Sequence, residues 1–139
     1  MIRTLFLLSL LLLVSCKEFA IKTSTALESF KCPQEENCLS SLNSGKSQIL
    51  HFKMMGEDEI QNILNLSKLV KSLPDTRIEK LDKNYLYITK GKVHIEFMAS
   101  QKERKIHIRS QVSKTGLFGE DKGKGIIVEI RFKFYQNDY

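Results

Sequence analysis

The sequence predicts an α+β fold in which an antiparallel sheet of three to five strands packs against one long helix. Two patterns indicate this class. Apolar residues recur with a helical period between Glu57 and Leu73, and they alternate with the period of two that is typical of strands between Tyr85 and Gln111. About 120 residues follow an N-terminal apolar segment, enough for one domain with its own core. We therefore expect a single α+β domain over residues 32–139.

The chain opens with a segment typical of an export signal. Residues 5–14 (LFLLSLLLLV) follow one basic residue, Arg3, and are fewer than the roughly 20 apolar residues that cross a bilayer as a helix. The next residues, Leu13-Val14-Ser15-Cys16, resemble the lipobox of bacterial lipoproteins, in which the chain is cut before a cysteine that receives diacylglycerol on its sulfur. We predict a signal peptide over residues 1–15 and lipidation of Cys16; an ordinary thiol after a conventional signal is the alternative.

A lipidated Cys16 would place the protein in the bacterial cell envelope, on the extracytoplasmic side of the outer or inner membrane. The two acyl chains of such an anchor are enough for stable attachment. Residues 16–31 have no sustained period and are expected to form a tether, with the folded part beginning near Cys32. The membrane is thus the first expected partner.

The cysteine count agrees with export. If Cys16 is lipidated, Cys32 and Cys38 remain as an even pair, which in an exported chain indicates a disulfide. So short a loop contributes about 2 kcal/mol in the chain-entropy model. A zinc site with both thiolates and a histidine is the alternative, but five intervening residues exceed the two to four usual in zinc hairpins. We expect no metal and no cofactor.

The first part of the domain is expected to be irregular. Residues 32–45 (CPQEENCLSSLNSG) are rich in turn formers and predict a loop closed by the disulfide. Residues 47–54 contain a short apolar stretch, Ile49, Leu50 and Phe52, which predicts a strand.

The helix is expected over Glu57–Leu73. Acidic residues 57–59 lie at the positive end of its macrodipole, Lys68 and Lys71 lie at the negative end, and Pro74 ends it. Its core face is predicted to consist of Ile60, Ile63, Leu64, Leu66, Val70 and Leu73.

After the helix the period changes to two. A short strand is expected over Arg77–Lys80, followed by strands over Tyr85–Thr89, Val93–Ser100 and Lys105–Gln111. A two-residue turn at Lys90-Gly91 and a four-residue turn at Gln101–Arg104 set the register, in which Glu96 lies opposite Arg109 and His94 lies beside Tyr87. One face then holds Leu86, Ile88, Val93, Ile95, Phe97, Ile106 and Ile108, and the other holds Tyr85, Tyr87, His94, Glu96, His107 and Arg109.

The last segment alternates apolar and polar residues, which by pattern predicts a strand. The apolar positions are Val128, Ile130, Phe132 and Phe134. Before them, Gly116, Gly119, Gly123 and Gly125 predict a flexible loop. These glycines do not match the phosphate-binding pattern G-x-x-x-x-G-K-[ST].

Two stretches resemble the domain of unknown function 1499 family. The stretch Cys32-Pro33-Gln34-Glu35-Glu36-Asn37-Cys38-Leu39-Ser40-Ser41 is similar to that family's opening C-P-x-x-P-N-C-V-S-S, and Ile106-His107-Ile108-Arg109-Ser110 with Ser113 and Gly116 is similar to its I-x-V-R-S-A-S-R-x-G segment. Glu36 in place of proline marks a divergent member. The resemblance implies that the last element is a helix, which Glu129 and Lys133 at i and i+4 would suit, so the C-terminal element is left as helix or strand.

The candidate ligand-binding residues are Arg109, Ser110, His94, His107, Glu96 and Tyr87. Arg109 and Ser110 are chosen because they correspond to the R-S pair in the segment of the family that this chain resembles. Arg109 could offer a bidentate fork to a carboxylate or phosphate, but simple pairing with Glu96 is the interpretation we favour. We assign no catalytic residue, since no nucleophile stands at a recognisable spacing from a base. Ser40 and Ser41 are better explained by hydrogen bonds in a turn or cap than by catalysis.

The net charge of +6 comes from 22 Lys and Arg against 16 Asp and Glu. Because basic residues are scattered among acids, we interpret them first as solvated surface, and contact with an anionic membrane or polymer is the alternative. No nucleic-acid partner is expected.

Two functional hypotheses follow. The first is an envelope lipoprotein of unknown biochemical activity, non-catalytic, which binds an envelope protein, polymer or lipid or serves a structural role. The second is a small-ligand carrier or enzyme with a cleft around Arg109, His94 and His107.

Overall fold

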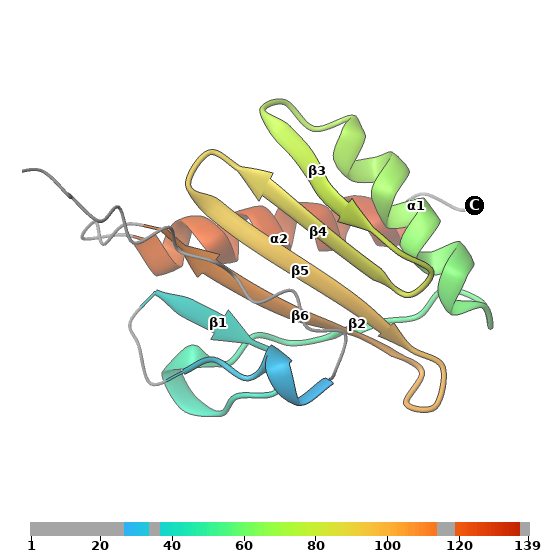
Figure 1. The fold of residues 1–139 in the computed structure, drawn as a ribbon, viewed down its shortest axis with the longest axis horizontal. Coiled ribbons are helices and arrows are strands. Elements are labelled where there is room, and N and C mark those ends of the chain that lie inside the picture. Colours follow the sequence, from blue (N-terminus) through green and yellow to red (C-terminus); the bar gives the residue numbers. More distant parts are fainter. Residues whose placement is uncertain (1–26, 34–36, 114–118, 137–139) are drawn as a thin grey trace, which may run out of the picture.

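The computed structural model describes residues 27–33, 37–113 and 119–136. In this part of the chain, six antiparallel strands form one sheet, and two α-helices lie on one of its faces (Figure 1). The α+β class is therefore confirmed. The sheet has more strands than the three to five expected, and two helices share the role that was assigned to one.

The strands follow a simple order. The sheet runs β1-β6-β5-β4-β3, and β2 pairs with β6 beyond the end of β1, so that β3 to β6 form a meander of sequential neighbours. The bounds are β1 Cys38–Ser40, β2 Phe52–Lys53, β3 Thr76–Leu81, β4 Tyr85–Lys90, β5 Val93–Ser100 and β6 Lys105–Val112.

The predicted register of β5 and β6 is confirmed, whereas the register of β4 and β5 differs from the predicted one by two residues. Glu96 pairs with Arg109 across β5 and β6, and the two faces contain the predicted residues. The loop between β4 and β5 is Gly91-Lys92, one position later than expected, with Gly91 at φ +59°. Moving a two-residue loop by one position shifts the pairing by two residues, so every side chain keeps its face.

Helix α1 spans Glu59–Lys71, and the Asp58 side chain caps it by accepting a hydrogen bond from the Ile60 N–H at 2.8 Å. Its buried face differs from the predicted one. Ile60 and Leu64 are about 40% exposed, whereas Leu69 joins Ile63, Leu66, Val70 and Leu73 in the core. Asn62 is buried because it forms hydrogen bonds to the backbone of Met55 and Asp58.

The C-terminal element is a helix, α2, over Gly119–Gln136. Ile127, Ile130 and Phe134 are fully buried, and Glu129 pairs with Lys133 at 3.2 Å. The alternating pattern predicted a strand because Val128 and Phe132, which face solvent, fall between the buried positions. Gly123 and Gly125 belong to α2 and not to a loop, while Gly116 lies outside the described residues.

The N-terminal part of the domain is more ordered than expected. A 3-10 helix, η1, spans Leu27–Phe30, within the expected tether of residues 16–31, and Phe30 is fully buried. The expected loop of residues 32–45 contains β1, and a second 3-10 turn, η2, covers Gly45–Ser47. Strand β2 is only two residues long, so most of the strand expected over residues 47–54 is irregular. Cys16 and residues 1–15 lie outside the described residues.

One apolar core lies between the sheet and the two helices. It joins the inner faces of β4, β5 and β6 to α1, α2 and the segment around Phe52. No helix among the described residues is long and apolar enough to span a bilayer.

Helix α2 approaches strand β6 most closely at Gly123. A Cβ atom at this position would lie 2.7 Å from the Ser110 hydroxyl, whereas a Cβ at Gly125 would meet nothing within 4 Å. Both glycines are in the same helix, so they differ mainly in this packing.

We therefore predict opposite effects for two alanine substitutions. Gly125→Ala should stabilise the fold by about 0.5–1 kcal/mol through helix propensity, whereas Gly123→Ala adds an overpacking cost of about 1–3 kcal/mol. Urea denaturation measures both. The variant Ser110→Ala with Gly123→Ala should recover much of the loss, and equal effects at the two glycines would contradict the close approach.

Candidate functional site

The face of the meander opposite the two helices carries the polar candidates. Tyr85, Tyr87, His94, Glu96, His107 and Arg109 all share it, as the alternation of β4, β5 and β6 requires. They do not form one site, because their contacts divide them into three groups.

The first group is a buried ion pair in the middle of the sheet. Glu96 is 1% exposed and Arg109 is 9% exposed, and the Arg109 Nε donates to Glu96 Oε2 at 2.6 Å while its Nη2 also contacts that oxygen. The Tyr85 hydroxyl donates to Glu96 Oε1 at 2.6 Å. Burial raises the pKa of Glu96, and the Tyr85 hydroxyl and the Arg109 guanidinium oppose that rise. Both carboxylate oxygens are therefore satisfied within the fold.

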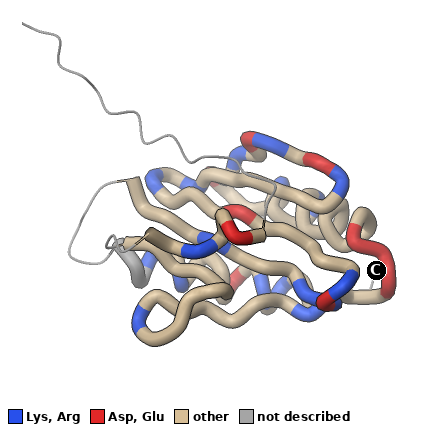
Figure 2. Tube along the Cα trace, turned by 60° about the horizontal axis from the view of Figure 1, so that its bottom comes forward, with Lys and Arg blue, Asp and Glu red and all other residues tan. Residues whose placement is uncertain are grey.

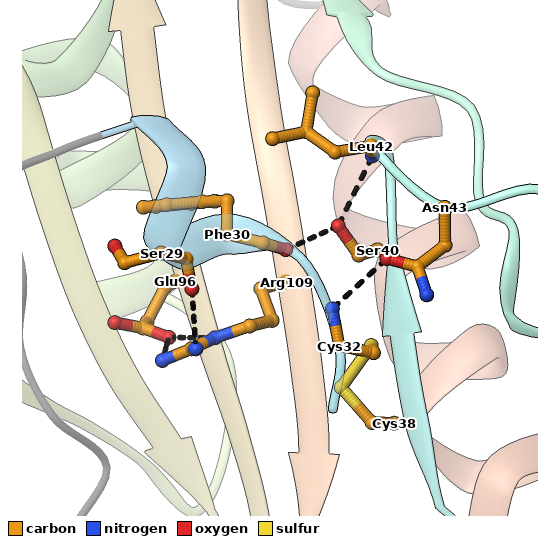
Figure 3. The surroundings of a disulfide bond; sticks show 9 residues. All are labelled: Ser29, Phe30, Cys32, Cys38, Ser40, Leu42, Asn43, Glu96 and Arg109. Carbon is orange, nitrogen blue, oxygen red and sulfur yellow. Dashed lines mark hydrogen bonds and ion pairs between the residues drawn. A yellow bond between two sulfur atoms is a disulfide. The ribbon is translucent and has the colours of Figure 1, made fainter. Parts of the chain in front are cut away.

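The last part of the expected tether, η1, lies over this pair (Figure 3). Arg109 Nη1 donates to the Ser29 carbonyl at 2.6 Å, and its guanidinium lies 5.9 Å from the centre of the Phe30 ring. Phe30 packs edge-on against Tyr85, in a small cluster with Met98. Arg109 thus binds two partners at once, the sheet through Glu96 and the N-terminal segment through Ser29.

The predicted disulfide is present and fastens the same segment. Cys32 and Cys38 are bonded at 2.07 Å, which joins the residues after η1 to the start of β1. The Cys32 N–H also donates to Asn43 Oδ1 at 2.9 Å, and the Ser40 hydroxyl donates to the Phe30 carbonyl while it accepts from the Leu42 N–H. Ser40 therefore has the turn role that its sequence context predicted.

The second group is Tyr87 with His94. The Tyr87 oxygen lies 2.7 Å from His94 Nδ1, and the two rings stack with their centres 6.1 Å apart. Burial lowers the pKa of His94 and raises the pKa of Tyr87. Both groups are thus held in their neutral forms near neutral pH.

The third group, Ser41, His107 and Glu103, has the order of a nucleophile, base and acid. The Ser41 hydroxyl lies 3.2 Å from His107 Nδ1, and His107 Nε2 lies 2.5 Å from Glu103 Oε2. Acyl transfer also needs N–H donors beside the nucleophile to hold an oxyanion. The N–H groups of Ser41, Leu42 and Asn43 instead donate to Ile108 O, Ser40 Oγ and Ser40 O, and the Ile108 N–H donates to the Ser41 hydroxyl. This group therefore fastens β1 to β6.

Ser110 does not lie with Arg109. It is the next residue along β6, so its side chain points to the opposite face, where it is buried beneath Gly123 of α2. Among the described residues, no three His, Cys, Asp or Glu side chains are arranged to hold a metal ion.

The sequence did not indicate Ser29, Phe30 and Glu103 as part of this face. Ser29 contributes only a backbone carbonyl, and the position of such a group leaves no trace in residue type. Phe30 could have been recognised from the sequence as part of the folded domain, because a large aromatic residue is usually buried and is unusual in a solvated tether.

The comparisons with known proteins give no relative: no protein-family model, curated protein or solved structure matches this chain. The resemblance to the domain of unknown function 1499 family therefore stays a prediction.

Substitution at the ion pair should be costly and strongly coupled. Arg109→Ala should destabilise the domain by about 3–5 kcal/mol because it leaves the Glu96 carboxylate buried without its partner. Arg109→Met with Glu96→Gln should cost clearly less than Arg109→Ala alone. Guanidinium denaturation measures both, and a double variant that is as unstable as Arg109→Ala or less stable would mean that the pair is not coupled.

The pH dependence of stability should reveal His94. Because its folded pKa is lowered, the unfolded chain binds more protons below the usual pKa of 6.5, so stability falls as the pH drops through this value. His94→Gln should therefore lose less stability than the natural protein between pH 7.5 and pH 6. Glu96 is the same in both proteins and cancels in the comparison.

Urea denaturation at several pH values measures this difference. His51→Gln is the matched comparison, since burial and Lys105 also lower the pKa of His51 and the same direction is expected. Parallel pH profiles for the natural protein and His94→Gln would contradict the prediction.

Proposed function

We propose that this protein is a bacterial envelope lipoprotein in which lipid on Cys16 holds a small α+β domain at a membrane, where it acts as a non-catalytic binding or structural module. One observation carries the non-catalytic part. Arg109 and Glu96, the groups best suited to bind a ligand, use their polar atoms on Ser29, Tyr85 and one another. A bound anion would have to compete with these contacts for the guanidinium of Arg109, a residue that is only 9% exposed.

The disulfide supports export. Disulfides persist in oxidising compartments and are rare in the cytosol, and here the bond fixes the segment that leads from Cys16 into the domain.

The chain length supports a position close to the bilayer. Leu27, the first residue of η1, lies eleven residues after Cys16. Fully extended, a segment of this length reaches at most roughly 40 Å. The domain would thus work within about one domain diameter of the membrane surface.

Membership of the domain of unknown function 1499 family is part of this proposal. Its two motifs are far apart in the sequence, yet they lie on neighbouring strands, where Ser40 of the first pairs with Arg109 of the second. Residues that contact one another in this way are expected to be retained together.

The alternative is a small-ligand carrier or enzyme around Arg109, His94 and His107. Its strongest support is the sequence of contacts from Ser41 through His107 to Glu103. The engaged N–H groups beside Ser41 favour the structural role instead.

Lipidation can be tested with the full chain in a bacterial host. We expect the natural chain to incorporate labelled fatty acid and to sediment with membranes, and Cys16→Ser to lose both properties because no thioether can form. The disulfide-free variant Cys32→Ser with Cys38→Ser is the control that should keep the label. Equal labelling of Cys16→Ser and the natural chain would refute the anchor.

A further inference from the structure

The outer side of α2 exposes an apolar surface. It consists of Leu50, Val128, Phe132 and Tyr135, whose side chains are 64%, 51%, 61% and 36% exposed, and we call it the α2 surface. Val128, Phe132 and Tyr135 follow the i, i+4, i+7 spacing of one helical stripe. Leu50 lies beside them, since Arg131 donates from Nη2 to the Leu50 carbonyl.

The α2 surface is held rigidly in place. The Tyr135 hydroxyl accepts a hydrogen bond from the Lys53 N–H at 2.6 Å, and the Arg131 guanidinium lies 5.0 Å from the centre of the Phe52 ring. Beneath the stripe, Ile127, Ile130 and Phe134 anchor the helix in the core. The exposed side chains are therefore presented by a fixed helix that runs along the sheet (Figure 1).

The rim of the α2 surface is basic. Lys53 and Lys124 are exposed beside it and Arg131 is half-buried, while Glu129 is paired with Lys133. Elsewhere along the described chain, basic and acidic residues are interspersed (Figure 2). The excess of basic residues beside the apolar stripe therefore distinguishes this surface from the rest of the domain.

We propose that the α2 surface docks on the anionic headgroup region of the membrane that carries the lipid anchor. This inference rests on the proposed function. A helix with aromatic and aliphatic residues on its outer side and lysines at the rim is suited to lie in the interface, where basic side chains are attracted to anionic headgroups.

The size of the surface favours lipid over a protein partner. A stable protein interface buries about 800 Å² on each side and involves roughly 20–30 residues. Four exposed apolar side chains fall well short of that. The same area is useful to a domain that a lipid anchor already keeps at high local concentration near the bilayer.

The geometry of the tether permits this contact. Segment η1 lies on the face of the sheet opposite α2, and packed layers are about 10 Å apart, so the chain must span roughly two to three layers to bring α2 to the membrane. Leu27 lies eleven residues after Cys16, and a fully extended segment of this length reaches at most roughly 40 Å, which is sufficient.

A second exposed apolar pair provides a matched control. Ile60 and Leu64 on α1 are 41% and 40% exposed, but they follow three acidic residues, 57–59, which an anionic surface repels. The chain contains no tryptophan, so a single introduced indole reports on either surface.

The test uses the lipidated full chain in vesicles of phosphatidylcholine and phosphatidylglycerol with brominated acyl chains, which quench tryptophan at the interface. We expect several-fold stronger quenching of Phe132→Trp than of Leu64→Trp. Removal of phosphatidylglycerol, or addition of Lys124→Glu to Phe132→Trp, should reduce the quenching.

Flotation of the vesicles separates the two proposals. If the chain floats but Phe132→Trp is quenched no more than Leu64→Trp, docking by the α2 surface is overturned while the anchor stands. If the chain does not float, the anchor is refuted and the docking inference falls with it. Concentration-dependent dimers that Phe132→Asp abolishes, together with no quenching, would assign the surface to a second copy of the chain and also overturn lipid docking.

Discussion

Much of this structure depends on the ion pair between Glu96 and Arg109, because a buried carboxylate in the middle of a sheet needs a nearby positive charge. Glu96 is nearly inaccessible to solvent, so Arg109 and Tyr85 must replace the water that it would otherwise bind. The guanidinium has further N–H donors, and the Ser29 carbonyl accepts a hydrogen bond from Nη1. The charge pair of the sheet thereby becomes the docking point for the N-terminal segment.

This arrangement explains why the two faces of the sheet differ. One face is covered by α1 and α2 over an apolar core, while the other is covered in part by a short segment held by polar contacts, an aromatic ring and a disulfide. On the second face, the polar side chains form hydrogen bonds with one another and with the N-terminal segment, and these bonds occupy groups that could otherwise bind a ligand.

The sequence predicted the meander well because alternation and turn length act together. A strand whose apolar residues occupy one face tolerates only registers that differ by two, so even a β4–β5 turn placed one residue early predicts the correct faces. The four-residue turn between β5 and β6 independently predicts the Glu96–Arg109 pair. Tyr87 and His94 also meet as expected. Ser110 was misjudged because adjacent residues in a motif invite a common role, although neighbours in a strand point to opposite faces.

Three features were harder to predict because tertiary contacts determine them: the type of the C-terminal element, the buried face of α1 and the position of the N-terminal segment. In α2, solvent-facing Val128 and Phe132 imitate a strand pattern, and only the contact of the helix with β6 distinguishes the two. In α1, hydrogen bonds that bury Asn62 turn the helix away from the face that hydrophobicity alone would choose. Segment η1 owes its position to a backbone carbonyl, which no residue pattern records.

The bond between Cys32 and Cys38 has a mechanical consequence. Tension applied at the N-terminal end first loads the contact between Ser29 and Arg109. Beyond it, the disulfide carries the load past residues 33–37 to β1, whose three residues pair with β6. Strand β6 lies between β1 and β5, so the load is passed to β5 and to the helices packed on the sheet, and the chain does not unravel from its N-terminal end. A pull on this end would therefore move the domain as a whole.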